Sequence, residues 1–294
     1  MTGTARRIRD MDAQFSLDGV SDLPLLMQRR AEAAKAALAR WPHHRALRYG
    51  PGEGETLNLF PAADGPAGTR APVLFFIHGG FWRSLDADLF SFLADGFVPY
   101  GAMLVVIDYP LMPAVRLADV RDACARALDW THAHAADHGG DPDRITLCGN
   151  SAGGHLVAEL ACADAGLARA AGTAGAGVPV AGAVPISGIY DLEPVTRSFQ
   201  DDSLNLTPEE VATLSPLRRA YRPVVPMLAA VGGEETGEFL RQNDAFAAAC
   251  TQAGQPSEAM HIPGANHVSV LTEALAAPGH PFNRRVRALM GLPG

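Results

Sequence analysis

Short apolar runs recur along this chain and alternate with longer stretches that carry apolar positions at helical spacing. The runs at residues 73–77 (Val-Leu-Phe-Phe-Ile) and 102–107 (Ala-Met-Leu-Val-Val-Ile) are typical of strands buried on both faces of a sheet. Further strands are predicted at residues 57–60, 145–148, 180–186, 224–231 and 258–262.

The stretches between these runs predict helices. We expect them at residues 23–41, 87–100 and 117–138, from 154 to about 167, at 239–253, and at the C-terminus around 286–290. Strands that alternate with helices in this way favour an α/β fold, with a mostly parallel central sheet and helices on both faces. Ligands bind such sheets beyond the carboxyl ends of the strands.

The chain shows no internal repeat and no boundary between two equal halves, so we predict a single domain over residues 1–294. Two segments are candidates for a small lid or cap over a site. One is the amphipathic N-terminal helix at about residues 22–41, and the other is the polar, Pro-containing segment 192–221. The Ala/Gly-rich segment 170–178 is predicted to be a flexible loop.

Composition is ordinary for a globular enzyme, and the expected partner is a small-molecule substrate. Of 294 residues, 48% are hydrophobic and 19% charged, and the formal net charge is -8. The basic pairs are Arg6-Arg7, Arg29-Arg30 and Arg284-Arg285. Isolated pairs of this kind are interpreted as solvated helix faces, so we expect no nucleic-acid partner. The oligomeric state is left open, with a homodimer as one candidate.

Nothing in the sequence predicts a cofactor, a metal or a membrane partner. None of the four cysteines belongs to a C-x-x-C pair, so buried thiols are expected. His132, His134 and His138 have a spacing that could serve a metal, but no carboxylate-rich cluster accompanies them. Residues 1–14 lack the apolar core of a signal peptide, and no apolar run approaches the roughly 20 residues that span a bilayer. A cytoplasmic location is therefore expected.

A G-x-S-x-G motif, residues 149–153, carries the most specific chemistry. It follows the strand at 145–148 and opens the helix that begins near Gly154. Strand, tight turn and helix are the context of the nucleophile elbow in α/β-hydrolases, which exposes the serine hydroxyl at the top of the sheet. Ser151 is therefore a candidate nucleophile, and a Gly/Ala/Ser turn without catalytic function is the alternative.

A serine hydroxyl needs a base, and the base needs an acid that orients it. In α/β-hydrolases these follow the serine in the order acid, histidine. Glu234 and Glu235 leave the strand at 224–231, and His267 follows the last predicted strand. Either glutamate is a candidate acid, and both are also consistent with surface acids at the start of the next helix.

The segment His78-Gly79-Gly80-Phe81-Trp82 follows the strand at 73–77. An H-G-G loop in this place supplies backbone N–H groups to an oxyanion hole, and the residue after the nucleophile supplies another. We therefore assign this role to the Gly79–Phe81 loop, chiefly through the N–H groups of Gly80 and Phe81, and to Ala152. An ordinary Gly-Gly turn is the alternative.

The fuller motif H-G-G-x-W, residues 78–82, resembles the kynurenine formamidase (arylformamidase) group within the esterase/lipase branch of the α/β-hydrolases. Three further stretches are similar to that group, namely residues 49–50 with 57–61, residues 187–194 with 214–216, and residues 235–242. The similarity covers most of the chain, from about residue 12 to the C-terminal helix. Glu235 falls where the group usually carries aspartate, and residues 170–178 look like an insertion.

This resemblance implies hydrolysis of the formamide of N-formylkynurenine, or of a similar aryl formamide, through an acyl-enzyme. Phe81, Trp82 and Tyr190 are candidate walls for an aromatic substrate, although core packing explains each of them nearly as well. A carboxylesterase acting on small acyl or aryl esters would share every catalytic residue. A non-catalytic binding protein on the same fold is a further alternative, but such a protein is expected to lack a triad member.

Overall fold

A computed structural model describes residues 11–63, 69–161, 179–218 and 225–293, and the expected loop at 170–178 lies outside these ranges. One eight-stranded sheet organises the fold, with strand order β1-β2-β4-β3-β5-β6-β7-β8. Strands β1 and β2 pair antiparallel, β2 also pairs antiparallel with β4, and all other neighbours are parallel. This confirms the predicted α/β-hydrolase class with its mostly parallel sheet.

The strands agree with the apolar runs of the sequence. They are β1 (His44–Arg48), β2 (Thr56–Phe60), β3 (Ala71–Ile77), β4 (Met103–Ile107), β5 (Gly140–Asn150), β6 (Val180–Ile186), β7 (Met227–Gly232) and β8 (Ser257–Ile262). Only β1 was not predicted, because its residues are polar and mostly exposed at the edge of the sheet.

Alternate residues of each central strand enter two separate cores. In β3, Val73, Phe75 and Ile77 belong to one core, while Leu74 and Phe76 belong to the other. A strand buried on both faces needs apolar side chains at every position, which explains why these strands appear as continuous hydrophobic runs.

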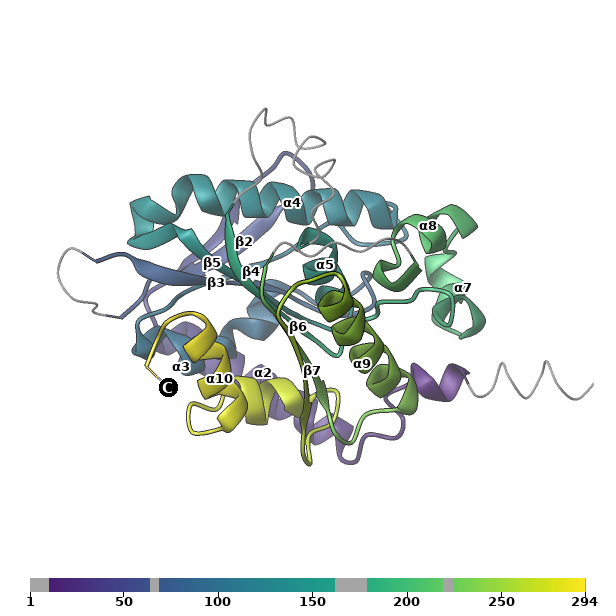
Figure 1. The fold of residues 1–294 in the computed structure, drawn as a ribbon. Coiled ribbons are helices and arrows are strands. Elements are labelled where there is room, and N and C mark those ends of the chain that lie inside the picture. Colours follow the sequence, from purple (N-terminus) through teal and green to yellow (C-terminus); the bar gives the residue numbers. More distant parts are fainter. Residues whose placement is uncertain (1–10, 64–68, 162–178, 219–224, 294) are drawn as a thin grey trace, which may run out of the picture.

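Two groups of helices cover the two faces (Figure 1). The first face carries α4 (Leu117–His134), α5 (Ala152–Leu160) and α9 (Gly237–Gln252). The second carries α2 (Leu23–Arg40), η1 (Ala87–Leu93), α3 (Ala94–Phe97), η2 (Val98–Tyr100), the π-helix η6 (Val270–Leu275) and α10 (Pro281–Leu289). The predicted continuous helix at 87–100 is therefore three short helical pieces, and α4 continues into a 3-10 turn, η3 (Ala135–His138).

The segment from residue 192 onward folds into short helical pieces beside the end of the sheet. They are η4 (Val195–Arg197), α7 (Asp201–Leu204), α8 (Pro208–Thr213) and η5 (Pro216–Arg218). Figure 1 shows α7 and α8 at the same end of the molecule as the purple N-terminal turn. Among the described residues, no helix has the length and apolar character needed to cross a membrane.

Candidate active site

Ser151 stands at a strained turn between β5 and α5. Its φ of 59° and ψ of -121° lie outside the regions that ordinary residues favour. Its backbone N–H donates to the carbonyl of Ile186 at 2.9 Å, which ties the turn to the end of β6. A Cβ atom at Gly153 would lie 2.0 Å from the carbonyl oxygen of Ile77, so the helix can approach the sheet this closely only with glycine there.

The loop after β3 passes directly beside the serine. A Cβ at Gly79 would lie 3.1 Å from Ser151 Cβ and 2.8 Å from the Asn150 carbonyl oxygen, so glycine permits the contact. Within the described ranges, the backbone N–H groups of Gly80, Phe81 and Ala152 donate no hydrogen bond to the protein. These donors remain free for an oxygen atom bound next to Ser151.

The buried side chains of His78 and Trp82 support the Gly79–Phe81 loop. The His78 ring donates through Nδ1 to the carbonyl of Gly79 at 2.7 Å. Because N–H and C=O point in opposite directions in a trans peptide, this bond turns the N–H of Gly80 away from His78. Burial lowers the pKa of His78 to about 4, so its ring is neutral with one N–H. Trp82 is fully buried and meets the ring of His155 edge-on at 5.2 Å.

His267 and Glu235 form the expected acid–base pair. The His267 ring donates through Nδ1 to Glu235 Oε2 at 2.6 Å, and the Glu235 side chain is fully buried. Glu234 is exposed. The two glutamates that the sequence left as alternatives are thus distinguished by position, and Glu235 is the one that contacts the histidine.

Ser187 completes the support of this pair and was given no role by sequence reasoning. Its hydroxyl and the backbone N–H of Gly232 both donate to Glu235 Oε1. Oε2 therefore stays available to His267. Ser187 follows β6 with a φ of 50°. Its place at a strand end is visible in the sequence, but its contact with a glutamate 48 positions later is not.

A cavity of about 240 Å³ joins the serine to the histidine. No hydrogen bond joins their side chains among the described residues, which is common before a substrate is bound. The aromatic side chains on its walls are Phe15, Phe81, Phe90 and Phe239, and its polar walls include Arg30, Arg83, Asn150 and Gln200. A flat, largely apolar substrate fits such a lining.

Residues 11–17 form a strap across this cavity, a function that the sequence did not suggest. Phe15 is 2% exposed and meets Phe81 and Phe239 edge-on at 6.3 and 5.8 Å. On one side its carbonyl accepts from Gln200 Nε2 at 2.9 Å. On the other side the Gln14 carbonyl accepts from the hydroxyl of Thr236 at 2.7 Å. The strap therefore links the segment after residue 192 to the turn that carries Glu235.

The predicted cap segments contribute in part. Helix α2 supplies Met27 and Arg30 to the cavity wall, and the segment 192–221 supplies Gln200. Arg30 is 6% exposed, so the expectation that the Arg29-Arg30 pair lies on a solvated face is wrong for Arg30 and holds only for the exposed Arg29. Burial also lowers the pKa of Arg30 to about 10.

Two expected wall residues lie elsewhere. Trp82 and Tyr190 are both fully buried, and neither lines the cavity. Tyr190 stacks on Phe246 at 4.0 Å, within the core beneath α9. Core packing, the alternative already evident from the sequence, accounts for both side chains, and Phe81 is the one predicted wall residue that faces the cavity.

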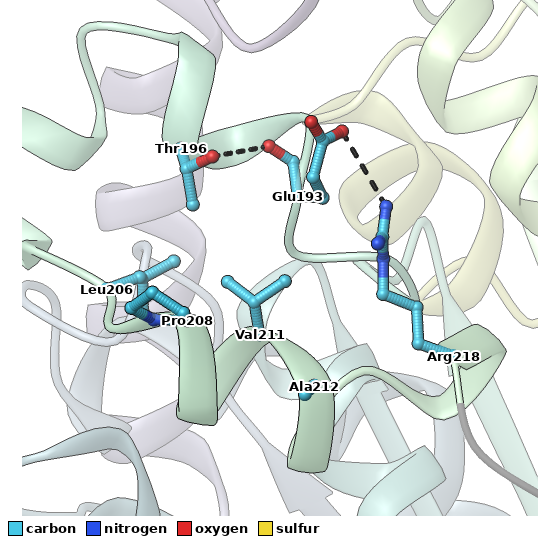
Figure 2. Close-up of a pocket in the computed structure, with 7 residues that line it drawn as sticks. All are labelled: Glu193, Thr196, Leu206, Pro208, Val211, Ala212 and Arg218. Atoms are coloured by element: carbon cyan, nitrogen blue, oxygen red, sulfur yellow. Dashed lines mark hydrogen bonds and ion pairs between the residues drawn. The ribbon is translucent and has the colours of Figure 1, made fainter.

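A larger hollow of about 480 Å³ lies on the segment after residue 192 (Figure 2). It is lined by Glu193, Thr196, Leu206, Pro208, Val211, Ala212 and Arg218. The Arg218 guanidinium lies 3.7 Å from Glu193, and none of the described lining residues is a histidine. The larger volume of this hollow therefore does not make it the candidate catalytic site. Within the described ranges no cluster of His, Cys, Asp and Glu could hold a metal ion, and Cys124, Cys148 and Cys250 are buried and form no disulfide.

The arrangement of elbow, loop and acid–base pair agrees with comparison to known proteins. Residues 74–271 match the model of a protein family whose description is the α/β-hydrolase fold. The chain belongs to this α/β-hydrolase family. Because the related proteins include formamidases and esterases, the protein is a hydrolase.

Individual relatives of this α/β-hydrolase carry different names. A kynurenine formamidase from Danio rerio is 26% identical over 235 residues, which cover 76% of this chain and 74% of the relative. Esterase LipQ from Mycobacterium tuberculosis is 30% identical over 250 residues, which cover 77% and 58%. A crystal structure from Silicibacter sp. TM1040, provisionally described as a thioesterase, is 26% identical with a TM-score of 0.79, covering 96% and 99%.

Proposed function

We propose that this hydrolase cleaves the formamide of N-formylkynurenine, or of a similar aryl formamide, through a formyl-enzyme on Ser151. The proposal rests on one observation. Ser151, three free backbone N–H groups and the His267–Glu235 pair come together around one cavity. The H-G-G-x-W loop and the formamidase relative support the choice of a formamide.

In the first step Ser151 Oγ attacks the formyl carbon, and His267 Nε2 takes the hydroxyl proton. The carbonyl oxygen becomes an oxyanion, which accepts from the N–H groups of Gly80, Phe81 and Ala152. One such donor typically contributes about 3 kcal/mol to transition-state stabilisation. His267 then protonates the aniline nitrogen as the C–N bond breaks, and the free amine departs.

In the second step a water molecule gives a proton to His267 and attacks the formyl-enzyme. Collapse of the second oxyanion returns the proton to Ser151 Oγ and releases formic acid, which loses its remaining proton to solvent and becomes formate. Glu235 fixes the ring of His267 and stabilises its transient positive charge throughout. No step requires a metal or an organic cofactor.

A carboxylesterase acting on small acyl or aryl esters is the second candidate. The observation that favours it is the similarity to a mycobacterial esterase at 30% identity. An ester would use the same residues, with an alcohol in place of the amine as leaving group. The two candidates therefore differ only in the substrate that the walls of the cavity select.

Rates on N-formylkynurenine and on 4-nitrophenyl acetate, measured with the same enzyme preparation, test the proposal. We expect the formamide to have the higher kcat/KM, and Ser151→Ala to lower turnover of both by at least about 10⁴-fold. Formamide hydrolysis at background with brisk ester hydrolysis would favour the esterase. Full turnover by Ser151→Ala would overturn the mechanism for both.

A further inference from the structure

The cavity beside Ser151 has an excess of positive charge. Arg30 and Arg83 line it, while none of its described lining residues is an aspartate or glutamate. The chain as a whole has the opposite balance, with a net charge of -8. The local charge therefore does not follow from composition, and it singles out the cavity as a place for an anionic group.

The two arginines differ in whether their N–H groups have hydrogen-bond partners in the protein. Arg83 donates to Ser203 Oγ and, at 2.5 Å, to Gln200 Oε1. Arg30 makes one long bond through Nε, 3.4 Å from the Leu89 carbonyl, and lies over the ring of Phe90 at 4.0 Å. Its Nη2 is buried and has no hydrogen-bond partner among the described residues. An unpaired charged donor is costly to bury, so a ligand that accepts its hydrogen bond would stabilise the site.

Asn150, which also lines this cavity, carries a second unpaired donor. The Nδ2 group of Asn150 is buried without a partner in the described ranges, and Asn150 directly precedes Ser151. Among the described side chains lining the cavity, only Arg30 and Asn150 have such unpaired buried atoms, and both atoms are donors. A carboxylate, with two acceptor oxygens and a negative charge, complements this pair.

We propose that the cavity binds a carboxylate of the substrate through Arg30, with Asn150 as a second donor, and that the enzyme therefore prefers acyl substrates carrying a free carboxylate. This inference rests on the proposed function, because it takes the Ser151 cavity as the place of hydrolysis. N-formylkynurenine carries a carboxylate on its amino-acid side chain, whereas simple alkyl and aryl esters carry none. Arg30 thus supplies a physical basis for choosing between the two candidate substrates.

The test uses two pairs of substrates, and in each pair a charged member carries a carboxylate that its neutral partner lacks. One pair is N-formylkynurenine and N-formyl-2-aminoacetophenone, with the carboxylate on the leaving group. The other is mono-4-nitrophenyl succinate and 4-nitrophenyl butyrate, with the carboxylate on the acyl group. We expect Arg30→Met to lower kcat/KM for the charged member of at least one pair by about 10- to 100-fold and to leave its neutral partner nearly unchanged.

Matched variants separate charge recognition from damage to the fold. Arg29→Met makes the same change at an exposed position of the same helix and should alter neither member of a pair. Arg30→Lys keeps the positive charge and should retain part of the preference for the charged substrate. The ratio of charged to neutral rates within each variant is insensitive to the fraction of folded enzyme.

Equal losses on charged and neutral substrates, or no loss on either, would overturn the carboxylate site. If only the esters are hydrolysed but Arg30 still controls the preference for the succinate, the formamidase proposal fails and the carboxylate site stands. If formamides are hydrolysed without regard to charge, the formamidase proposal stands and the carboxylate site fails.

Discussion

At the scale of single residues, the candidate site depends on pairs of neighbours that the sequence presents as equivalent. Glu234 and Glu235 follow the same strand, and Arg29 and Arg30 occupy the same turn of one helix. In each pair one member is exposed and the other is held inside, against His267 or in the cavity wall. The direction in which each side chain points decides its role, and consecutive residues give matched controls for one another.

The two glutamates give the sharpest residue-scale test. Glu235→Gln should lower kcat by about 10⁴-fold, because an amide can neither hold the His267 ring in the same tautomer nor stabilise its charge. Glu234→Gln removes the same charge from an exposed position and should leave kcat unchanged. Steady-state kinetics on one substrate suffice for both variants. Equal effects of the two changes would contradict the assignment of Glu235 as the acid.

At the scale of elements, the strap of residues 11–17 is the feature that closes the cavity. It is held by hydrogen bonds to the segment after residue 192, to Thr236 before α9 and to the first turn of α9. Its aromatic side chain, Phe15, fills the space between Phe81 and Phe239. Phe239 in turn packs on the ring of His267 at 4.5 Å, so the strap, α9 and the candidate base form one contiguous wall.

Shortening this strap side chain should change which substrates are accepted. Phe15→Ala enlarges the cavity, so kcat/KM on 4-nitrophenyl octanoate should rise relative to that on 4-nitrophenyl acetate. Loss of a buried phenylalanine also lowers the free energy of unfolding, by about 3 kcal/mol or more. Leu25→Ala, at a side chain that is 43% exposed on α2, is the matched control and should alter neither quantity. An unchanged octanoate-to-acetate ratio in Phe15→Ala would argue against the strap as a wall.

At the scale of the whole molecule, the chemistry is gathered from strand ends far apart in the sequence. Ser151 follows β5, Glu235 follows β7 and His267 follows β8, while His78 follows β3 near the centre of the sheet. Parallel pairing brings these carboxyl ends to one edge. The stability of the sheet therefore also maintains the site, and groups buried at this edge should influence the stability of the entire protein.

His78 should make the stability of the protein sensitive to acid. Its pKa is lowered from 6.5 to about 4 by burial, so below pH 6.5 the unfolded chain takes up a proton that the folded protein does not. The free energy of unfolding should then fall as the pH decreases from 6.5 towards 4, and His78 should account for about 2 kcal/mol of the loss by pH 4.5. Urea unfolding of the wild type and of His78→Asn at pH 7 and 4.5 measures this. A loss of the same size in the variant would exclude His78 as its source.

The sequence by itself determined the class of the fold and indicated the candidate catalytic residues. Short continuous apolar runs that alternate with helical stretches favour strands buried on both faces, and the order of elbow, acid and histidine along them predicts Ser151 and His267 at one edge. Local pattern also placed α2, α4 and α9 to within a few residues. Where it was wrong, at 87–100, the chain forms 3-10 and α turns that fit around buried aromatic side chains, including Phe90 and Phe97.

Only the tertiary structure decided which side chains meet. The selection of Glu235 over Glu234, the support from Ser187, the closure by Phe15 and the burial of Arg30 all depend on contacts between residues distant in sequence. Trp82 and Tyr190, which the sequence suggested as walls of the cavity, are instead buried in the core. Periodicity reports which face of an element is buried, but not what that face is buried against, and substrate choice depends on the latter.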